Sequence, residues 1–250
     1  MENKCVVVIP SRFGSVRLPG KPLADIHGQP MVQRVYERAL KSGVAEVIIA
    51  TDDERIFQVC KKFGAHVELT DKAHQSGTDR ISELATRLNW PDDKIIINVQ
   101  GDEPFLPPGL ISQVQTLLEN DLKAAMATLV TPINTMDEWE DSNTVKVVTD
   151  CNDQALYFSR APIPWPRDNN EVNGLRHIGI YGYRAWALKK LALSPSCPLE
   201  KIERLEQLRA LWLGLPIRVA TACIVPPKGV DTIEDLEAIS QKSLKSFDVS

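Results

Sequence analysis

The residues best suited to chemistry lie in one short segment near the start of the chain. Three cations, Arg12, Arg17 and Lys21, fall within ten residues, and Gly14 and Gly20 are interleaved with them. Glycine lets the backbone approach a ligand and expose its N–H groups. Arginine binds phosphate oxygens bidentately, and lysine supplies a compact charge. Three cations this close repel one another unless an anion lies among them. The segment therefore predicts a phosphate-binding loop that holds a triphosphate.

This loop differs from two common phosphate motifs. It lacks the GxxxxGK[ST] pattern of P-loop nucleotidases and the GxGxxG pattern of dinucleotide-binding oxidoreductases. Both protein classes are therefore disfavoured. A solvated turn with ordinary surface charges is the competing interpretation for each cation taken alone. It is disfavoured for all three together, because they directly follow a buried strand.

Strands and helices alternate around this loop through the first ~100 residues. We predict strands at Lys4–Ile9, Glu46–Ala50, Ala65–Leu69 and Lys94–Val99, and helices at Met31–Lys41, Asp53–Phe63 and Thr78–Leu88, the last with Thr78 as its N-cap. The strands are apolar on both faces, which is typical of a Rossmann-like, mostly parallel sheet with helices on both faces. Ligands bind such sheets at the carboxyl ends of the strands. Two features occupy those ends, the loop after Ile9 and the Gly101–Pro104 turn.

The second half of the chain is less regular. We predict strands at Ala124–Thr131, Val145–Thr149, Leu156–Ser159, His177–Tyr183 and Ile217–Thr221, and helices at Lys201–Leu213 and Thr232–Ser240. The proline-rich segment Ala161–Gly174 must be a loop. No flexible linker separates the halves. We expect a single α/β domain over residues 1–250, with a smaller β-rich insertion over roughly 132–185.

Bulk composition excludes several functions. The 250 residues carry a net charge of −4, which argues against a nucleic-acid partner. The apolar run Cys5–Ile9 is too short for a signal peptide or a membrane span, so no membrane association is expected. Five scattered cysteines without CxxC spacing favour neither a disulfide framework nor a zinc site. We expect a reduced, cytoplasmic protein.

Other polar residues lie where they could meet a triphosphate. Asp102 follows a buried strand and suits Mg²⁺, although from sequence alone a simple Gly-Asp turn residue is the favoured interpretation. Asp231 could be a second carboxylate or an ordinary helix N-cap. Ser76 and Arg80 lie at the predicted start of a helix, where anions bind. Arg80 is the better candidate for a nucleotide contact.

The loop IPSRFGSVRLPGKPL resembles the N-terminal motif of sugar nucleotidyltransferases, and more narrowly that of the CMP-Kdo synthetases, where Kdo is 3-deoxy-manno-octulosonate. Further segments of that family follow in the same order across nearly the whole chain: ATDDERI, HQSGTDR, INVQGDEPF, VKVV, ALYFSRAPIPW, LRHIGIYGYR, LEKIERLEQLR and GVDTIEDLE. One departure is Val16, which stands where the family usually has threonine.

This resemblance implies a cytidylyltransferase that joins CTP and Kdo with Mg²⁺ and works as a homodimer through the insertion. The implied nucleotide-binding residues are Pro10, Ser11, Arg12, Arg17, Lys21, Ser76, Arg80 and Gln100. The implied metal ligands are Asp102 and Asp231, and the implied catalytic residues are Arg12, Lys21 and Asp102. The implied sugar-binding residues are Gln100, Arg160, His177, Tyr181, Glu206 and Gln207.

The residue types fit these sugar-binding roles unequally. Arg160 could bind a substrate carboxylate bidentately. His177 and Tyr181 share one face of a strand, but a pair of core aromatics would do the same. Adjacent residues on a helix point about 100° apart, so one of Glu206 and Gln207 faces the sugar and the other supports it.

Two alternatives to this function stay open. A related acceptor, 8-amino-Kdo or a sialic acid, would need a similar pocket. A nucleotide-binding regulatory protein without catalysis is disfavoured, because it would be expected to lose the metal carboxylates, and both Asp102 and Asp231 are present.

Overall fold

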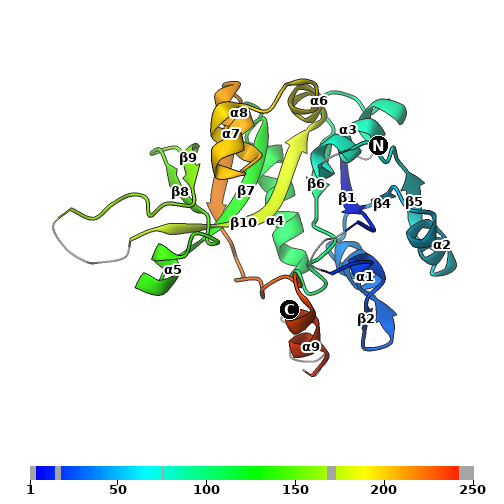
Figure 1. Cartoon of the computed structure of the whole chain (residues 1–250). Helices are drawn as coiled ribbons and strands as arrows, with labels where there is room; N and C mark the ends of the chain where they lie inside the picture. Colours follow the sequence, from blue (N-terminus) through cyan, green and yellow to red (C-terminus); the bar gives the residue numbers. More distant parts are fainter. Residues whose placement is uncertain (1–3, 15–17, 75, 168–172, 242–250) are drawn as a thin grey trace.

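The structure, a computed structural model, describes residues 4–14, 18–74, 76–167 and 173–241. These residues build a nine-stranded mixed sheet between two layers of helices (Figure 1). Its strands are β1 (Cys5–Ser11), β4 (Val47–Thr51), β5 (His66–Leu69), β6 (Ile95–Asn98), β7 (Met126–Pro132), β8 (Lys146–Thr149), β9 (Ala155–Ser159), β10 (Leu175–Arg184) and β11 (Ile217–Thr221). Two short strands, β2 (Asp25–Ile26) and β3 (Gln29–Pro30), form a separate ribbon.

The helices alternate with the strands along most of the chain. They are α1 (Met31–Lys41), α2 (Glu54–Lys62), α3 (Gly77–Arg87), α4 (Pro108–Asn120), α5 (Met136–Glu140), α6 (Ala185–Leu193), α7 (Pro198–Glu203), α8 (Gln207–Trp212) and α9 (Ile233–Ser240), with a 3₁₀ turn, η1 (Lys21–Leu23). No described helix is long and apolar enough to cross a membrane.

The sheet is mostly parallel, as predicted. Its main path runs β11-β7-β10-β6-β1-β4-β5. β1 pairs in parallel with β4 and β6, and β4 with β5, whereas the long strand β10 runs antiparallel between β6 and β7. The chain leaves β1 toward β4 on one side and returns to β6 on the other. The carboxyl ends of β1 and β6 therefore flank the point where such sheets bind ligands.

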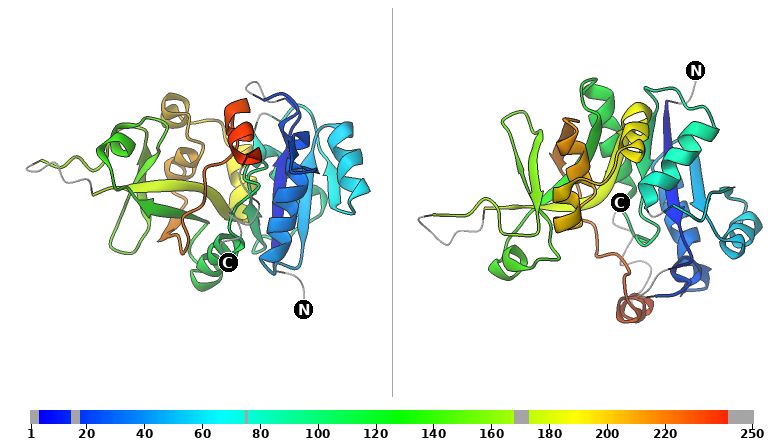
Figure 2. Two further views of the ribbon diagram at one scale, coloured as in Figure 1. Left: turned by 90° about the horizontal axis from the view of Figure 1, so that it is seen from below. Right: turned by 45° about the horizontal axis from the view of Figure 1, so that its top comes forward.

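Alternate residues of β1 explain why its sequence is apolar throughout. Val6 and Val8 face the core beneath α3, α6 and α8, while Val7 and Ile9 face the core beneath α1, α2 and α4. Successive side chains of a strand point to opposite faces, so a strand covered on both sides has no polar face. Figure 2 shows the two helical layers on either side of the sheet. The prediction of helices on both faces is confirmed.

Four helical assignments differ from the sequence-based expectation, and one of them is the short helix α5, which was not predicted. The predicted helix Lys201–Leu213 is wrong, because α7 and α8 are separate and Arg204 between them has a left-handed backbone (φ 53°). A non-glycine residue in that conformation ends a helix. α4 and α6 were not predicted. α4 begins at Pro108, and proline is compatible with the first turn of a helix although it reads as a loop residue.

The predicted insertion corresponds to α5, the β8–β9 hairpin and most of β10. The hairpin joins the sheet through β10, where Leu175 and Arg176 pair with Val147 and Lys146. This region extends from one side of the molecule in Figure 1. The single-domain organisation and the role of the insertion in dimerisation stay predictions.

Candidate active site

A cavity of about 240 Å³ lies at the carboxyl ends of β1 and β6. Four segments that are far apart in sequence enclose it: the end of β1 with the loop after it, the turn after β6, the N-terminus of α3 and the residues before α9. Its lining residues are Pro10, Ser11, Arg12, Lys21, Pro22, His74, Ser76, Gly77, Arg80, Gln100, Gly101, Asp102 and Asp231. Nine of the residues predicted to bind nucleotide or metal are among them. The structure thus brings the predicted nucleotide site together in one place.

The end of β1 supplies Pro10 and Ser11, and the loop after it supplies Arg12 and Lys21. The buried Ser11 Oγ has no hydrogen-bond partner among the described residues. The facing Gly101 lets the two loops approach, because a Cβ there would lie 2.9 Å from the Pro10 carbonyl oxygen and 3.1 Å from Ser11 Oγ. Arg17 and Val16 lie outside the described residues.

Lys21 lies between the two predicted metal ligands. Its Nζ donates to Asp102 Oδ2 at 2.7 Å and to Asp231 Oδ1 at 3.0 Å. The lysine side chain is 11% exposed, so its charge lies near the floor of the cavity. Gly20 makes this placement possible, because its left-handed backbone (φ 70°) turns the chain into η1. Asp102 and Asp231, which are 81 and 210 positions from Lys21 in the sequence, thereby converge on one ammonium group.

Asp231 does not cap α9, so the N-cap interpretation is wrong. Thr232 is the N-cap: its side chain accepts from the backbone N–H of Asp235, and Asp235 accepts from the backbone N–H of Thr232. This reciprocal capping box satisfies the helix start without Asp231. The Asp231 carboxylate is therefore directed at Lys21 rather than at its own helix.

The two carboxylates fit a magnesium ion. Asp102 and Asp231 already share one cationic partner, so both can reach a cation placed between them. Among the described residues, no three His, Cys, Asp or Glu side chains gather in one place. Mg²⁺ is commonly held by one or two carboxylates, with waters and substrate phosphates as the other ligands. This donor set therefore suits Mg²⁺ bound together with a triphosphate.

The N-terminus of α3 forms the opposite wall. The predicted N-cap Thr78 is wrong: Ser76 caps the helix by accepting from the backbone N–H of Asp79 at 3.1 Å. Thr78 is the second residue of the helix, and its hydroxyl donates to Glu206. Arg80 is 2% exposed, and its guanidinium pairs with Asp52 at 2.7 Å while still lining the cavity. Asp52 is not among the residues predicted for the site, although the ATDDER motif contains it.

The turn after β6 also holds a second acidic residue that the sequence analysis missed. Burial, and then the neighbouring charge of Asp102, raises the pKa of Glu103 to about 7. Gln100 and Asp102 on either side of Gly101 line the cavity. Paired acidic residues in the GDEP turn are the signal that could have identified Glu103.

His177 and Tyr181 lie together, away from the cavity. Their ring centroids are 5.1 Å apart, which confirms that both face the same side of β10. His177 Nε2 lies 2.9 Å from Thr128 Oγ1, and Phe158 meets the imidazole edge-on at 5.3 Å. Burial lowers the pKa of His177 to about 3, so the ring is neutral near pH 7. Burial likewise raises the pKa of Tyr181.

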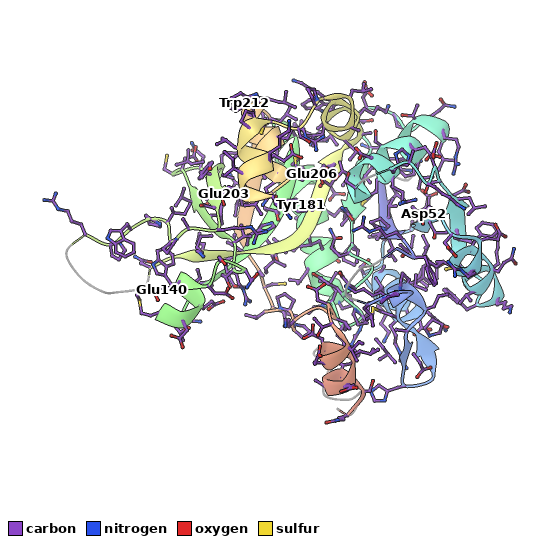
Figure 3. All side chains as sticks on the ribbon, viewed as in Figure 1. Asp52, Glu140, Tyr181, Glu203, Glu206 and Trp212 are labelled. Carbon is purple, nitrogen blue, oxygen red and sulfur yellow. The ribbon has the colours of Figure 1, made fainter. Side chains whose placement is uncertain are left out.

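Glu206 links these aromatics to the nucleotide cavity. Its Oε2 accepts from Thr78 Oγ1 at 2.7 Å, and Thr78 is two residues from the cavity residue Ser76. In Figure 3, Tyr181, Glu203 and Glu206 gather around β10, α7 and α8. Burial raises the pKa of Glu206, although its hydrogen bond from Thr78 opposes the shift. Gln207 is buried beside it, at 7% exposed.

Arg160 holds backbone rather than an open pocket. Its Nε donates to the Glu203 carbonyl oxygen at 2.7 Å, and its Nη1 donates to the Ser142 carbonyl oxygen at 2.9 Å. The Glu203 carboxylate in turn accepts from Ser159 Oγ and from the Arg160 backbone N–H. Arg160 therefore ties the end of β9 to α7, next to the region of Glu206.

Comparison with known proteins gives a consistent result. A family model described as cytidylyltransferase matches residues 6–217. The chain is 53% identical over 242 residues to the 3-deoxy-manno-octulosonate cytidylyltransferase of Thioalkalivibrio sulfidiphilus, covering 94% of this chain and 97% of the relative. It is 51% identical over 245 residues to the protein of the same name from Halorhodospira halophila, covering 94% and 95% of the two chains.

Solved structures agree with these relatives. A CMP:2-keto-3-deoxy-manno-octonic acid synthetase complexed with CTP superposes with a TM-score of 0.89 at 44% identity, over 95% of this chain and 97% of that one. A cytidylyltransferase from Leptospira borgpetersenii shares the fold at 20% identity and a TM-score of 0.62, over 95% and 85% of the chains. The chain belongs to the cytidylyltransferase family, and within it to the group of 3-deoxy-manno-octulosonate cytidylyltransferases.

Proposed function

We propose that this chain transfers CMP from CTP to Kdo, with release of diphosphate, and so activates Kdo for lipopolysaccharide synthesis. The observation that carries the proposal is the convergence of Lys21, Asp102 and Asp231 in a cavity at the carboxyl ends of β1 and β6. Relatives about half identical over nearly the whole chain carry the name of this activity.

The reaction is a substitution at the α-phosphorus of CTP. The anomeric 2-hydroxyl oxygen of Kdo forms the new P–O bond, the bond between the α-phosphorus and the bridging oxygen breaks, and the hydroxyl proton passes to solvent. Such transfers depend chiefly on positioning and charge stabilisation. Arg12 and Lys21 line the cavity and would neutralise the departing diphosphate. Arg17 would add a third cation.

Asp102 and Asp231 would hold Mg²⁺. When bound, the ion would neutralise phosphate charge and lower the pKa of the attacking hydroxyl. The two aspartates have the second task of holding Lys21 in the nucleotide-free protein. Replacing Asp102 by Asn should abolish the Mg²⁺-dependent activity. Near-normal rates at ordinary Mg²⁺ concentrations would remove Asp102 from the metal site.

The acceptor would bind between the cavity and the aromatic cluster of β10. Glu206 is the residue best placed for sugar hydroxyls, since it lies one hydrogen bond from α3 and close to Tyr181. Gln100 borders the cavity on the same side as Asp102. His177, Gln207 and Arg160 are enclosed by other contacts and would shape this pocket.

We also propose a cytoplasmic homodimer. Leu156 and Trp165, on and after β9, are 59% and 70% exposed, and large exposed apolar side chains favour a protein contact. All five cysteines are free, as a reducing compartment would leave them. Sedimentation equilibrium of the wild type and of Leu156→Lys tests the dimer. A monomeric wild type would contradict it.

The activity is tested by diphosphate release, measured with each of the four nucleoside triphosphates and a panel of sugar acids. We expect release with CTP and Kdo, dependent on Mg²⁺. If the enzyme prefers 8-amino-Kdo or a sialic acid, that sugar acid replaces Kdo as the proposed acceptor. No release with any pair, combined with measurable CTP binding, would favour a regulatory nucleotide-binding protein.

A further inference from the structure

Two aspartates of the ATDDER segment, Asp52 and Asp53, directly follow β4 and have different tasks. Asp53 caps α2: its side chain accepts from the backbone N–H of Arg55 at 2.9 Å. Asp52 does not cap this helix. Its Oδ2 accepts instead from Nη2 of Arg80, 28 residues later in the chain, at 2.7 Å. Figure 3 places Asp52 on the β4–β5 side of the molecule, away from Glu206 and Tyr181.

Arg80 is a buried cation at the wall of the nucleotide cavity. It is 2% exposed overall, but it belongs to the residues that line the cavity. A second anchor, the buried Thr70 after β5, accepts from Nη1 of the same guanidinium. The Thr70 hydroxyl also donates to the Thr51 carbonyl oxygen at 3.1 Å, which ties this anchor to the end of β4.

Two groups at the ends of adjacent strands thus hold both terminal nitrogens of Arg80. Neither Asp52 nor Thr70 lines the cavity, so they can act on a ligand only through the arginine. A guanidinium has five N–H donors in a fixed plane, and fixing two of them sets the direction of the rest. An arginine oriented before the ligand arrives loses little freedom when it binds.

We propose that Asp52 is a positioning residue of the nucleotide site: together with Thr70 it fixes the Arg80 guanidinium against the cavity wall so that it meets CTP already oriented. This inference rests on the proposed function, because it takes CTP as the ligand. The ATDDER segment would thus orient a nucleotide-binding arginine, which is a different role from metal binding or acceptor binding.

A purely structural role for Asp52 predicts a different pattern. If Asp52 only balances a buried charge, any carboxylate that reaches Arg80 suffices. Asp52→Glu keeps that charge but moves the guanidinium by the length of one methylene group. Positioning therefore predicts that Asp52→Glu keeps a melting temperature near that of the wild type and weakens CTP binding. Charge balance alone predicts unchanged CTP binding.

The experiment is calorimetric titration of CTP into the full-length protein without Kdo, with the KM for Kdo and the melting temperature measured in parallel. We expect Asp52→Asn and Asp52→Glu to weaken CTP binding about tenfold, as for the loss of one hydrogen bond to a charged group. The KM for Kdo should stay unchanged. Thr70→Val, which keeps the ion pair, should weaken CTP binding roughly threefold.

A matched control exists on the same helix. Arg87 of α3 pairs with Glu68 of β5 at 2.8 Å, but the pair is exposed and neither residue lines the nucleotide cavity. Glu68→Gln should change CTP affinity less than about twofold, as expected for an exposed ion pair. In the Arg80→Gln background, Asp52→Asn should have no further effect on CTP binding.

The outcomes separate this inference from the proposed function. A wild type that binds no CTP, or that does not join CTP and Kdo, contradicts the proposed function. A working wild type whose CTP affinity is unchanged in Asp52→Glu and Thr70→Val overturns the positioning role alone. An Asp52→Asn effect that persists in Arg80→Gln also overturns it, even if Asp52→Asn is less stable by itself.

Discussion

The nucleotide side and the acceptor side of the site are built in different ways. On the nucleotide side, residues from four separate segments converge on a cavity, where Ser11 Oγ has no hydrogen-bond partner among the described residues and the Lys21 ammonium lies between two carboxylates. On the acceptor side, His177 packs between aromatic rings and Arg160 holds two carbonyl oxygens. The nucleotide side is an open, charged cavity, whereas on the acceptor side most polar groups already have hydrogen-bond partners within the protein.

This difference follows from the sheet. Parallel strands end together, so the loops after β1 and β6 face each other. Most of the acceptor residues come from the antiparallel strand β10, from the start of α8 and from Arg160 after β9. These elements are held together by side-chain contacts such as that of Arg160 with α7. A preformed phosphate site and a pocket that adjusts to its sugar are the expected result.

The largest effect should come from the nucleotide side. Lys21→Ala removes the cation that, under the proposed function, would face the leaving diphosphate. We expect a barrier roughly 2–4 kcal/mol higher, the cost of one preorganised charge contact. Single-turnover diphosphate release measures it. Lys228→Ala, at an exposed lysine paired with Asp235, is the control and should leave turnover unchanged. Equal rates in wild type and Lys21→Ala would remove the lysine from the chemistry.

Glu206→Gln tests whether the acceptor side acts independently. The amide keeps an acceptor for Thr78 but loses the charge. We expect kcat/KM for Kdo to fall by a factor that corresponds to about 1.5–3 kcal/mol in the activation free energy. The Kd for CTP serves as the internal comparison and should be the same in Glu206→Gln as in the wild type. If the Kd for CTP rises by the same factor, the two sides are coupled through the Thr78–Glu206 hydrogen bond, and the comparison fails.

Gly174→Ala probes the packing that supports the insertion. A Cβ at Gly174 would lie 1.9 Å from the buried Trp139 ring, so α5 must shift, at a cost of about 1–3 kcal/mol in the free energy of unfolding. Urea denaturation measures it. Gly109→Ala in α4 is the matched control, because its new Cβ meets only Cys223 Sγ at 3.8 Å. A similar stability in both variants would contradict the close packing of Trp139.

His177 should make the acceptor side sensitive to acid. Its pKa is lowered by burial to about 3, so the unfolded chain binds a proton below pH ~6.5 that the folded chain does not. Stability from this group is complete above pH ~6.5 and falls by about 1.4 kcal/mol per pH unit below it. Denaturation at pH 7.5 and 5.5 of wild type and His177→Gln measures the difference. An identical pH dependence in both would refute a buried neutral imidazole.

The parallel half was predictable from sequence because its signals are local. Apolar runs such as Val6–Ile9 are long enough to identify strands, and Gly43 and Gly64 mark helix ends. The convergence of Arg12 and Asp102 follows from strand order. The family resemblance named nine residues that line this cavity, and their roles in binding stay predictions.

The remaining differences depend on contacts between distant residues. The choice between Ser76 and Thr78 as N-cap is decided by Glu206, 128 residues from Thr78, which takes the Thr78 hydroxyl. The left-handed Arg204 breaks a segment whose helix propensity is otherwise high. The task of Asp52 becomes visible only when Arg80 lies next to it. None of these contacts has a signature within a short window of sequence.

The ammonium of Lys21 between Asp102 and Asp231 has a consequence for how ligands assemble. A free divalent ion must compete with this ammonium for the same two carboxylates. When the ion arrives bound to a triphosphate, the phosphate oxygens can take over as partners of Lys21. The two carboxylates are then available to the ion. Metal and nucleotide should therefore each raise the affinity of the other, and by linkage the two gains must be equal. The nucleotide-free enzyme would bind metal weakly, with its own side chain as the competing ion.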